Sequence, residues 1–139
     1  MSTTAADIDL RRISQEYFAA WEACDPDRIA ALHTPDSRFQ LHAGGELAEG
    51  RGAVRQAFVD VFEQWPGYHF ETHRVLYGER HWVLDWDLLA TLKVEQAGRA
   101  VDKAVRLHCL DVVTVSDDGL VERKDTFVDV AQVNALFAA

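Results

Sequence analysis

The chain has 139 residues, and its 14 lysines and arginines against 23 aspartates and glutamates give a formal charge of −9. This length and a hydrophobic fraction of 48% suffice for one globular domain with its own core, which we expect to span residues 1–139. The negative charge disfavours phosphate backbones and anionic lipid surfaces, so we expect neither nucleic acid nor membrane as a partner.

The sequence carries no targeting or membrane-spanning pattern. The stretch MSTTAADIDLRR lacks the apolar centre of a signal peptide, and no apolar run approaches the roughly 18 residues that a spanning helix needs. The cysteines, Cys24 and Cys109, are far apart, and neither lies in a C-x-x-C pair. We therefore expect a cytoplasmic protein with free thiols.

The first half of the chain is predicted to be mostly helical. Apolar residues recur at helical spacing over 5–24, and Asp25 then serves as the N-cap of a short helix over 26–33, with Pro26 in its first turn. A third helix is expected over 52–65, where apolar residues again form one stripe.

The second half is predicted to form strands joined by short turns. This segregation of helices and strands indicates the α+β class rather than alternating βαβ units. A short segment that contains three apolar residues follows at 129–137. Strands are expected over 37–42, 68–77, 81–94, 102–116 and 120–128.

Alternation along the strands separates an inner from an outer face. In 81–92 the tryptophans share the apolar inner face, whereas Asp85 and Asp87 lie on the outer face, where we expect them to be solvated. In 105–115, Asp111 lies on the apolar face. A buried carboxylate must be neutral or hydrogen-bonded, so Asp111 is either a functional acid or a structural one bonded to a tyrosine or a backbone amide.

Two further polar groups are candidates for the interior. Strict alternation in 120–127 places Arg123 and Asp125 on one face of the strand. The two side chains either reach into a pocket or form an exposed ion pair. Tyr17 and Trp21 lie one turn apart on the first helix. A buried tyrosine needs a partner for its hydroxyl, and Asp111 is a candidate for that partner.

Four segments, taken in order, resemble the nuclear transport factor 2-like superfamily, and within it the SnoaL-like polyketide cyclase and ketosteroid isomerase branch. They are YFAAWEACDPDRIAALHTPDSRFQL, EGRGAVRQAFVDVF, WVLDWDLLATL and LDVVTVSDDGLVERKDTFVD, and the resemblance covers about residues 8–130. It implies a cone in which a curved mixed sheet wraps around N-terminal helices and one apolar pocket. It also implies a homodimer formed through the outer face of the sheet.

The isomerase branch implies a first set of site residues. Its oxyanion-hole tyrosine lies eight residues before the acid between the first two helices, and Tyr17 lies eight before Asp25. Its protonated aspartate matches Asp111 in CLDVVTV. Its catalytic base is an aspartate after the first strand, where this chain has His42 instead, which can serve as a base.

Other branches imply different sites. The cyclases carry a catalytic aspartate in a motif similar to RKDTFVD, which matches Asp125 as the acid/base with Arg123 in place of a histidine. The dehydratases use an Asp–His dyad, which matches Asp25 and His73. The epoxide hydrolases use an Arg-x-Asp pair on the middle strand, where this chain has Trp86 and Leu88.

The expected pocket is apolar, with a few polar groups that reach in. Tyr17, His42, Asp111 and Asp125 would be the catalytic residues. We expect no metal or cofactor, because no Cys/His spacing fits a zinc site and no phosphate-binding loop is present. The residues expected to bind substrate, with Tyr17 also in the wall, are Trp21, Phe39, Phe58, Trp86, Leu107 and Arg123.

Three functions are compatible with the sequence. The first is cofactor-free general acid/base catalysis of the isomerase or cyclase type on an apolar, carbonyl-bearing substrate. The second is a module that binds an apolar small molecule without reacting it. The third is a dehydratase or eliminase that uses Asp25 and His73, which requires the two side chains to meet inside the pocket.

Overall fold

The computed structural model describes residues 8–137 and confirms the α+β class, with helices first and strands after them. The four long predicted strands and the three predicted helices are all present. Among the described helices, none has both the length and the apolar character to cross a membrane. The elements are α1 (Leu10–Glu22), α2 (Pro26–Ala31), β1 (His33–His42), β2 (Ala48–Glu49), α3 (Arg51–Gln64), β3 (His69–Tyr77), β4 (His81–Gln96), β5 (Arg99–Val115), β6 (Val121–Val128) and α4 (Val130–Phe137).

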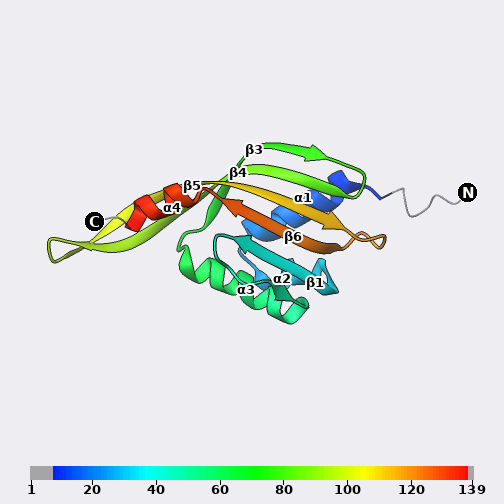
Figure 1. Cartoon of the computed structure of the whole chain (residues 1–139), viewed down its shortest axis with the longest axis horizontal. Helices are drawn as coiled ribbons and strands as arrows, with labels where there is room; N and C mark the ends of the chain where they lie inside the picture. Colours follow the sequence, from blue (N-terminus) through cyan, green and yellow to red (C-terminus); the bar gives the residue numbers. More distant parts are fainter. Residues whose placement is uncertain (1–7, 138–139) are drawn as a thin grey trace, which may run out of the picture.

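The strands form one mixed sheet in the order β2-β1-β6-β5-β4-β3. Strand β1 pairs with β6 in parallel, and every other neighbouring pair is antiparallel. Figure 1 shows that β4 and β5 continue past the other strands as a long hairpin, with α4 beside β5. The tip of this hairpin is Ala97-Gly98, where both residues have positive φ, 53° and 78°, as a tight two-residue turn requires.

Aromatic side chains join α1 and α3 to the inner face of the sheet. Tyr17 and Phe18 from α1 both meet Trp82 of β4 edge-on, with ring centroids 5.8 and 5.9 Å apart. Trp21 packs against Phe58 of α3 at 4.8 Å. The inner faces predicted from alternation in β4 and β5 are confirmed, because Trp82 is fully buried and Asp111 is only 3% exposed.

Strand β6 departs from strict alternation. The register between β5 and β6 shifts at Glu122, which is an extra residue on β6. Val121 and Lys124 are therefore both buried, 0% and 5% exposed, although they are three positions apart. Strict alternation would put Arg123 and Asp125 on the same face as Val121. The bulge turns these two side chains to the outer face and turns Lys124 inward.

Strand β1 begins four residues earlier than predicted, at His33, and contains Pro35. A proline cannot donate a ladder hydrogen bond, and it is tolerated here because the β1–β6 register is irregular between His33 and Arg38. The two-residue strand β2 lies between the predicted strand over 37–42 and the predicted helix over 52–65, and it pairs with β1 at the edge of the sheet.

Candidate functional site

A cavity of about 320 Å³ opens between the inner face of the sheet, the end of α3 and the loop after β1. Its wall is mostly apolar and aromatic, with Trp21, Trp65, Tyr68 and Trp86 among the lining residues. Its size lies at the lower end of the range of small-molecule sites. The cavity wall also carries the charged side chain of Lys124.

Lys124 forms a buried ion pair with Asp111. The Nζ atom of Lys124 lies 3.1 Å from Oδ2 of Asp111, and the two side chains are only 6% and 4% exposed. The hydroxyl of Thr126 donates to Oδ1 of the same carboxylate at 2.8 Å. Both oxygens of Asp111 therefore accept a hydrogen bond, as a buried carboxylate requires. Lys124 and Thr126 line the cavity, and Asp111 lies behind them.

The surroundings of Lys124 keep its side chain cationic. Burial alone would lower the pKa of Lys124, but the Asp111 carboxylate and the Tyr17 hydroxyl outweigh burial and raise that pKa above its ordinary value. The ammonium also lies over two aromatic rings, 5.1 Å from the centroid of Tyr17 and 4.3 Å from that of Trp21. The site therefore presents a fixed positive charge to an apolar cavity.

The hydroxyl of Tyr17 has a different partner from the predicted one. It lies 2.8 Å from Nε2 of His33, whereas Asp111 was the expected partner. Burial raises the pKa of Tyr17. Burial, together with the positive charges of Lys124 and Arg51, lowers the pKa of His33 to about 3, so the imidazole is neutral. Arg51 in turn donates to the backbone carbonyl of His33.

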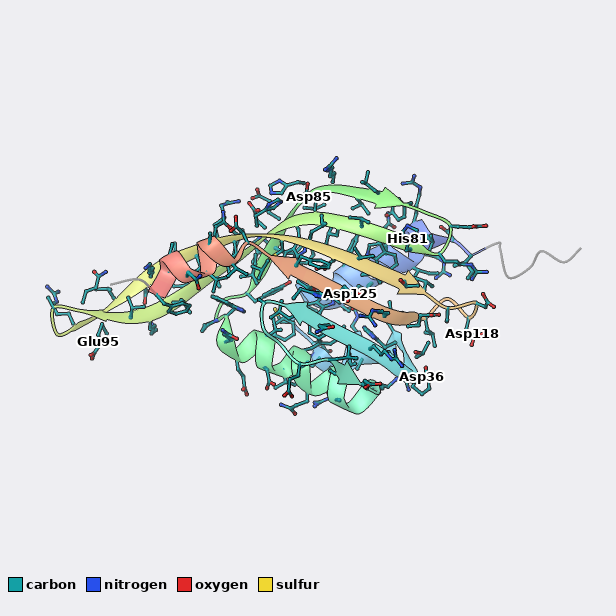
Figure 2. All side chains as sticks on the ribbon, in the orientation of Figure 1. Asp36, His81, Asp85, Glu95, Asp118 and Asp125 are labelled. Carbon is teal, nitrogen blue, oxygen red and sulfur yellow. The ribbon has the colours of Figure 1, made fainter. Side chains whose placement is uncertain are left out.

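Asp125 and His42, two of the predicted catalytic residues, meet on the outer face of the sheet. Asp125, which is labelled in Figure 2, bonds His42 Nε2 at 2.8 Å, and alternation along β6 puts it on the face opposite the buried Lys124. Arg123 donates two hydrogen bonds to the same carboxylate, at 2.8 and 3.0 Å. The Arg123 bonds, supported by His42, lower the pKa of Asp125. None of these three residues lines the cavity.

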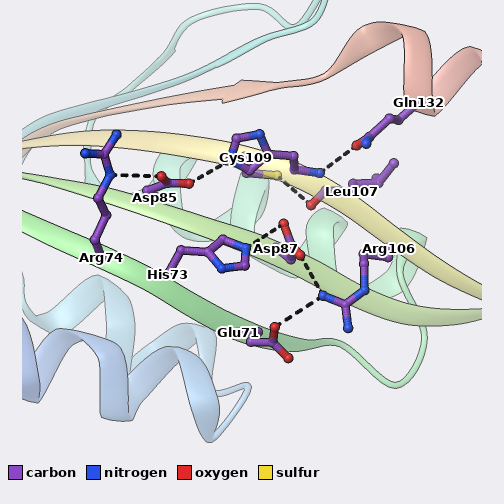
Figure 3. Close-up of polar contacts among 10 residues, drawn as sticks. Glu71, His73, Arg74, Asp85, Asp87, Arg106, Leu107, Cys109 and Gln132 are labelled. Carbon is purple, nitrogen blue, oxygen red and sulfur yellow. Dashed lines mark hydrogen bonds and ion pairs between the residues drawn. The ribbon is translucent and has the colours of Figure 1, made fainter.

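The structure does not bring Asp25 and His73 together. Asp25 caps α2 and accepts a hydrogen bond from the backbone N–H of Arg28 at 3.2 Å. His73 lies on the outer face of β3, where its Nε2 atom is 3.0 Å from Asp87 (Figure 3). Neither Asp25 nor His73 lines the cavity.

The expectation that Asp87 is solvated is wrong, because this residue is covered on the outer face of the sheet. Its side chain is only 11% exposed, because His73 and Arg106 cover it, and Arg106 donates to it at 2.6 Å. Burial would raise the pKa of Asp87, but these two hydrogen bonds lower it. Arg106 also bonds Glu71 (Figure 3). Glu71, His73 and Asp87 have metal-compatible spacing, yet both carboxylates already bind the Arg106 guanidinium.

The predicted apolar lining is found in part around the cavity. Trp21, Trp86 and Leu107 line it, whereas Phe39 and Phe58 are buried in the core without reaching it. Lys124 is the residue that sequence reasoning missed. The signal that could have revealed it is the mixed polarity of both faces of 120–127, which is typical of a strand that changes phase.

The model of the SnoaL-like domain matches residues 14–123, a range that contains α2, α3, strands β1 to β5 and most of α1. The chain belongs to the SnoaL-like domain family. A search of curated protein sequences gave no significant match.

Solved structures of SnoaL-like proteins share this fold at low sequence identity. A proposed SnoaL-like polyketide cyclase from Jannaschia sp. CCS1 is 20% identical, with a TM-score of 0.77 over 94% of this chain and 91% of that one. The epoxide hydrolase/cyclase-like enzyme SalBIII, which acts in pyran ring formation in salinomycin, is 20% identical, with a TM-score of 0.72 over 88% and 92%. A proposed ketosteroid isomerase from Kribbella flavida DSM 17836 is 22% identical, with a TM-score of 0.65 over 86% and 76%.

The buried neutral His33 predicts a loss of stability in mild acid. The unfolded chain protonates this histidine near pH 6.5, whereas the folded chain resists protonation until about pH 3. The unfolded state therefore binds more protons between these values, and the free energy of unfolding falls as pH is lowered through this window, by at most ~1.4 kcal/mol per pH unit.

Urea unfolding between pH 7 and pH 4 measures this dependence. We expect His33→Gln to flatten the pH dependence, whatever its effect on stability at pH 7. His81→Gln, at an exposed position at the start of β4 (Figure 2), is the matched control and should leave the slope unchanged. Equal slopes in the wild type and in His33→Gln would contradict the prediction.

Proposed function

We propose that this SnoaL-like protein is a cofactor-free acid/base enzyme that acts on an apolar, carbonyl-bearing small molecule in the cavity. The observation that carries the proposal is the buried Lys124–Asp111 ion pair, of which Lys124 lines the cavity and Asp111 lies directly behind it. Burying two charges costs several kcal/mol per ion. A protein that only binds an apolar ligand has no need of such a charged pair. Groups of this kind in an apolar cleft are typical of catalytic sites.

The proposed chemistry is the removal and return of a proton next to a carbonyl group. Asp111 takes the α-proton of the substrate, and the electron pair of that C–H bond moves onto the carbonyl oxygen to give an enolate. The ammonium of Lys124 stabilises the oxygen as it becomes negative. The protonated Asp111 then returns the proton to carbon. Alternatively, the enolate carbon attacks a second carbonyl carbon of the same molecule, the π electron pair of that C=O bond moves onto its oxygen, and this oxygen takes the proton back from Asp111.

The ion pair supports roles that differ in part from the expected ones. The isomerase resemblance implies a protonated Asp111 that donates to the enolate. Both oxygens of Asp111 accept hydrogen bonds, from Lys124 and from Thr126, so we assign the base role to Asp111 and the donor role to Lys124. Tyr17 is a second donor if His33 Nε2–H supplies the hydrogen bond between them, because the hydroxyl proton of Tyr17 is then free.

The second candidate is a module that binds an apolar ligand without reacting it. The position of Asp125 and His42 favours this alternative. The resemblance implied catalytic roles for both residues, and they do contact each other, but neither lines the cavity. Binding without proton transfer distinguishes this alternative from the enzyme.

Deuterium exchange tests the proposed reaction class without knowledge of the natural substrate. 2-Tetralone is an apolar ketone with exchangeable α-protons. We expect the wild type to catalyse their exchange in D₂O, followed by NMR, and Asp111→Asn to lower the rate by at least about 100-fold, the usual contribution of a general base. Lys124→Met should lower the rate by a similar factor, because it removes a donor to the enolate oxygen.

Asp125→Asn is the matched control, since it changes the same functional group on the opposite face of the sheet. It should retain the wild-type exchange rate. Binding of 2-tetralone by the wild type with no exchange above buffer would support the binding module. A large loss in Asp125→Asn with none in Asp111→Asn would contradict the assigned roles.

We also propose that the chain forms a homodimer through the outer face of the sheet. Support comes from apolar side chains on that face, where Leu110 and Val112 are half-buried and Phe127 is 42% exposed. Sedimentation equilibrium should give about twice the chain mass of 15.7 kDa. Phe127→Glu should give the monomer, whereas Phe137→Glu on α4 should not. A monomeric wild type would exclude the dimer.

A further inference from the structure

One tyrosine in the wall of the main cavity has a hydroxyl group without a partner. The hydroxyl of Tyr17 bonds His33 at 2.8 Å. The hydroxyl of Tyr77 bonds Ser14 at the same distance. The hydroxyl of Tyr68, in contrast, has no hydrogen-bond partner among residues 8–137, although Tyr68 lines the cavity. A hydroxyl in this position can bond a ligand without giving up a bond to the protein.

The Tyr68 hydroxyl lies deep in the protein and is still reachable. Burial raises the pKa of Tyr68 well above its ordinary value, so the phenol keeps its proton at neutral pH. The polar atoms that are both enclosed and unpartnered include the indole nitrogens of Trp82 and Trp86, but they do not include the Tyr68 oxygen. Because Tyr68 lines the cavity, a deep oxygen on it that is not enclosed opens into that cavity.

The fold fixes the position of Tyr68 before any ligand binds. Pro66 and Gly67 follow the end of α3, and Gly67 has a positive φ of 71°, which a glycine adopts without strain. The carbonyl of Pro66 accepts a hydrogen bond from the backbone N–H of Thr91 on β4 at 2.9 Å. A group that is already fixed binds without the entropy cost of ordering a mobile side chain. Three rings pack against the Tyr68 ring, with centroids 5.8, 5.2 and 6.4 Å away: those of Trp21, Phe62 and Trp86.

The other hydroxyl, amide and ammonium groups of the cavity wall are engaged or exposed. Lys124 and Thr126 both bond Asp111. Gln64 lies at the end of α3 and is exposed. Tyr68 precedes β3, whereas Lys124 belongs to β6, so the two polar groups enter the cavity from different elements. The cavity therefore offers a ligand a hydroxyl group in addition to the ammonium.

We propose that the Tyr68 hydroxyl binds a second oxygen of the substrate and selects for it. This inference rests on the proposed function, which it deepens. The reacting carbonyl oxygen is the one that Lys124 stabilises, and the oxygen at Tyr68 takes no part in the proton transfer. The substrate class is thus an apolar ring ketone that carries a further hydroxyl or carbonyl group. Tyr68 is the specificity-determining residue for that group.

Hydroxylated forms of 2-tetralone test the second oxygen. The four isomers with one hydroxyl group on the aromatic ring present this oxygen at every free position of that ring. We expect at least one isomer to bind the wild type about tenfold more tightly than 2-tetralone in isothermal titration calorimetry, which corresponds to about one net hydrogen bond. Tyr68→Phe removes only the hydroxyl oxygen. It should abolish this gain and leave the affinity for 2-tetralone unchanged.

Tyr77→Phe is the matched control, because it makes the same change in a tyrosine that bonds Ser14 and does not line the cavity. It should retain the gain, and so should Gln64→Leu, which removes the exposed amide of the wall.

A spectroscopic measurement on the wild type tests Tyr68 even if Tyr68→Phe does not fold. The chain has three tyrosines, so labelling their ζ-carbons with ¹³C gives three signals. The signal of Tyr68 is assigned by elimination, from the losses in Tyr17→Phe and Tyr77→Phe. It should shift more with the preferred isomer than with 2-tetralone.

Failure of this inference and failure of the proposed reaction are distinguishable, because equilibrium binding needs no turnover. No gain for any isomer in the wild type, a gain that Tyr68→Phe retains, or a Tyr68 signal that responds equally to both ligands would overturn the role of Tyr68. Absence of deuterium exchange with an intact gain would overturn the reaction and leave the role of Tyr68 standing.

Discussion

A charged pair in an aromatic interior is the constraint on which the rest of the site depends. Lys124 and Asp111 are nearly inaccessible to water, and their charged groups compensate each other across 3.1 Å. The Thr126 hydroxyl fixes the carboxylate, and the rings of Tyr17 and Trp21 contact the ammonium. The cavity therefore has one charged side chain, that of Lys124, among its described lining residues, and this charge orients a ligand as well as binding it.

The bulge at Glu122 places this charged pair inside the protein. Because one extra residue shifts the phase of β6, the strand turns Lys124 and Thr126 inward where a regular strand would turn Arg123 and Asp125 inward. The same shift creates the outer Asp125–His42–Arg123 cluster. A single backbone irregularity thus decides which charges meet the cavity and which meet the outer face.

The fold followed from the sequence more completely than the site did. Hydrophobic periodicity predicted α1, α3 and the four long strands, and it placed Asp111 inside, because burial imposes a strong alternation on β4 and β5. It failed at β6, where the mixed polarity of both faces indicates a change of phase but does not identify the residue at which the bulge occurs. It also missed the Tyr17–His33 bond, since a contact between a helix and a strand 16 residues away depends on packing that periodicity does not encode.

A double-mutant cycle on Lys124 and Asp111 tests the central claim most directly. Urea unfolding at pH 7 should show a loss of about 3–5 kcal/mol for Lys124→Met and for Asp111→Asn, because each leaves an unpaired buried charge. The double variant should lose no more than the worse single one, since neither charge remains and the Thr126 hydroxyl still has an amide oxygen to bond. Losses that add to within about 0.5 kcal/mol would show that the two charges are not coupled and would contradict this account.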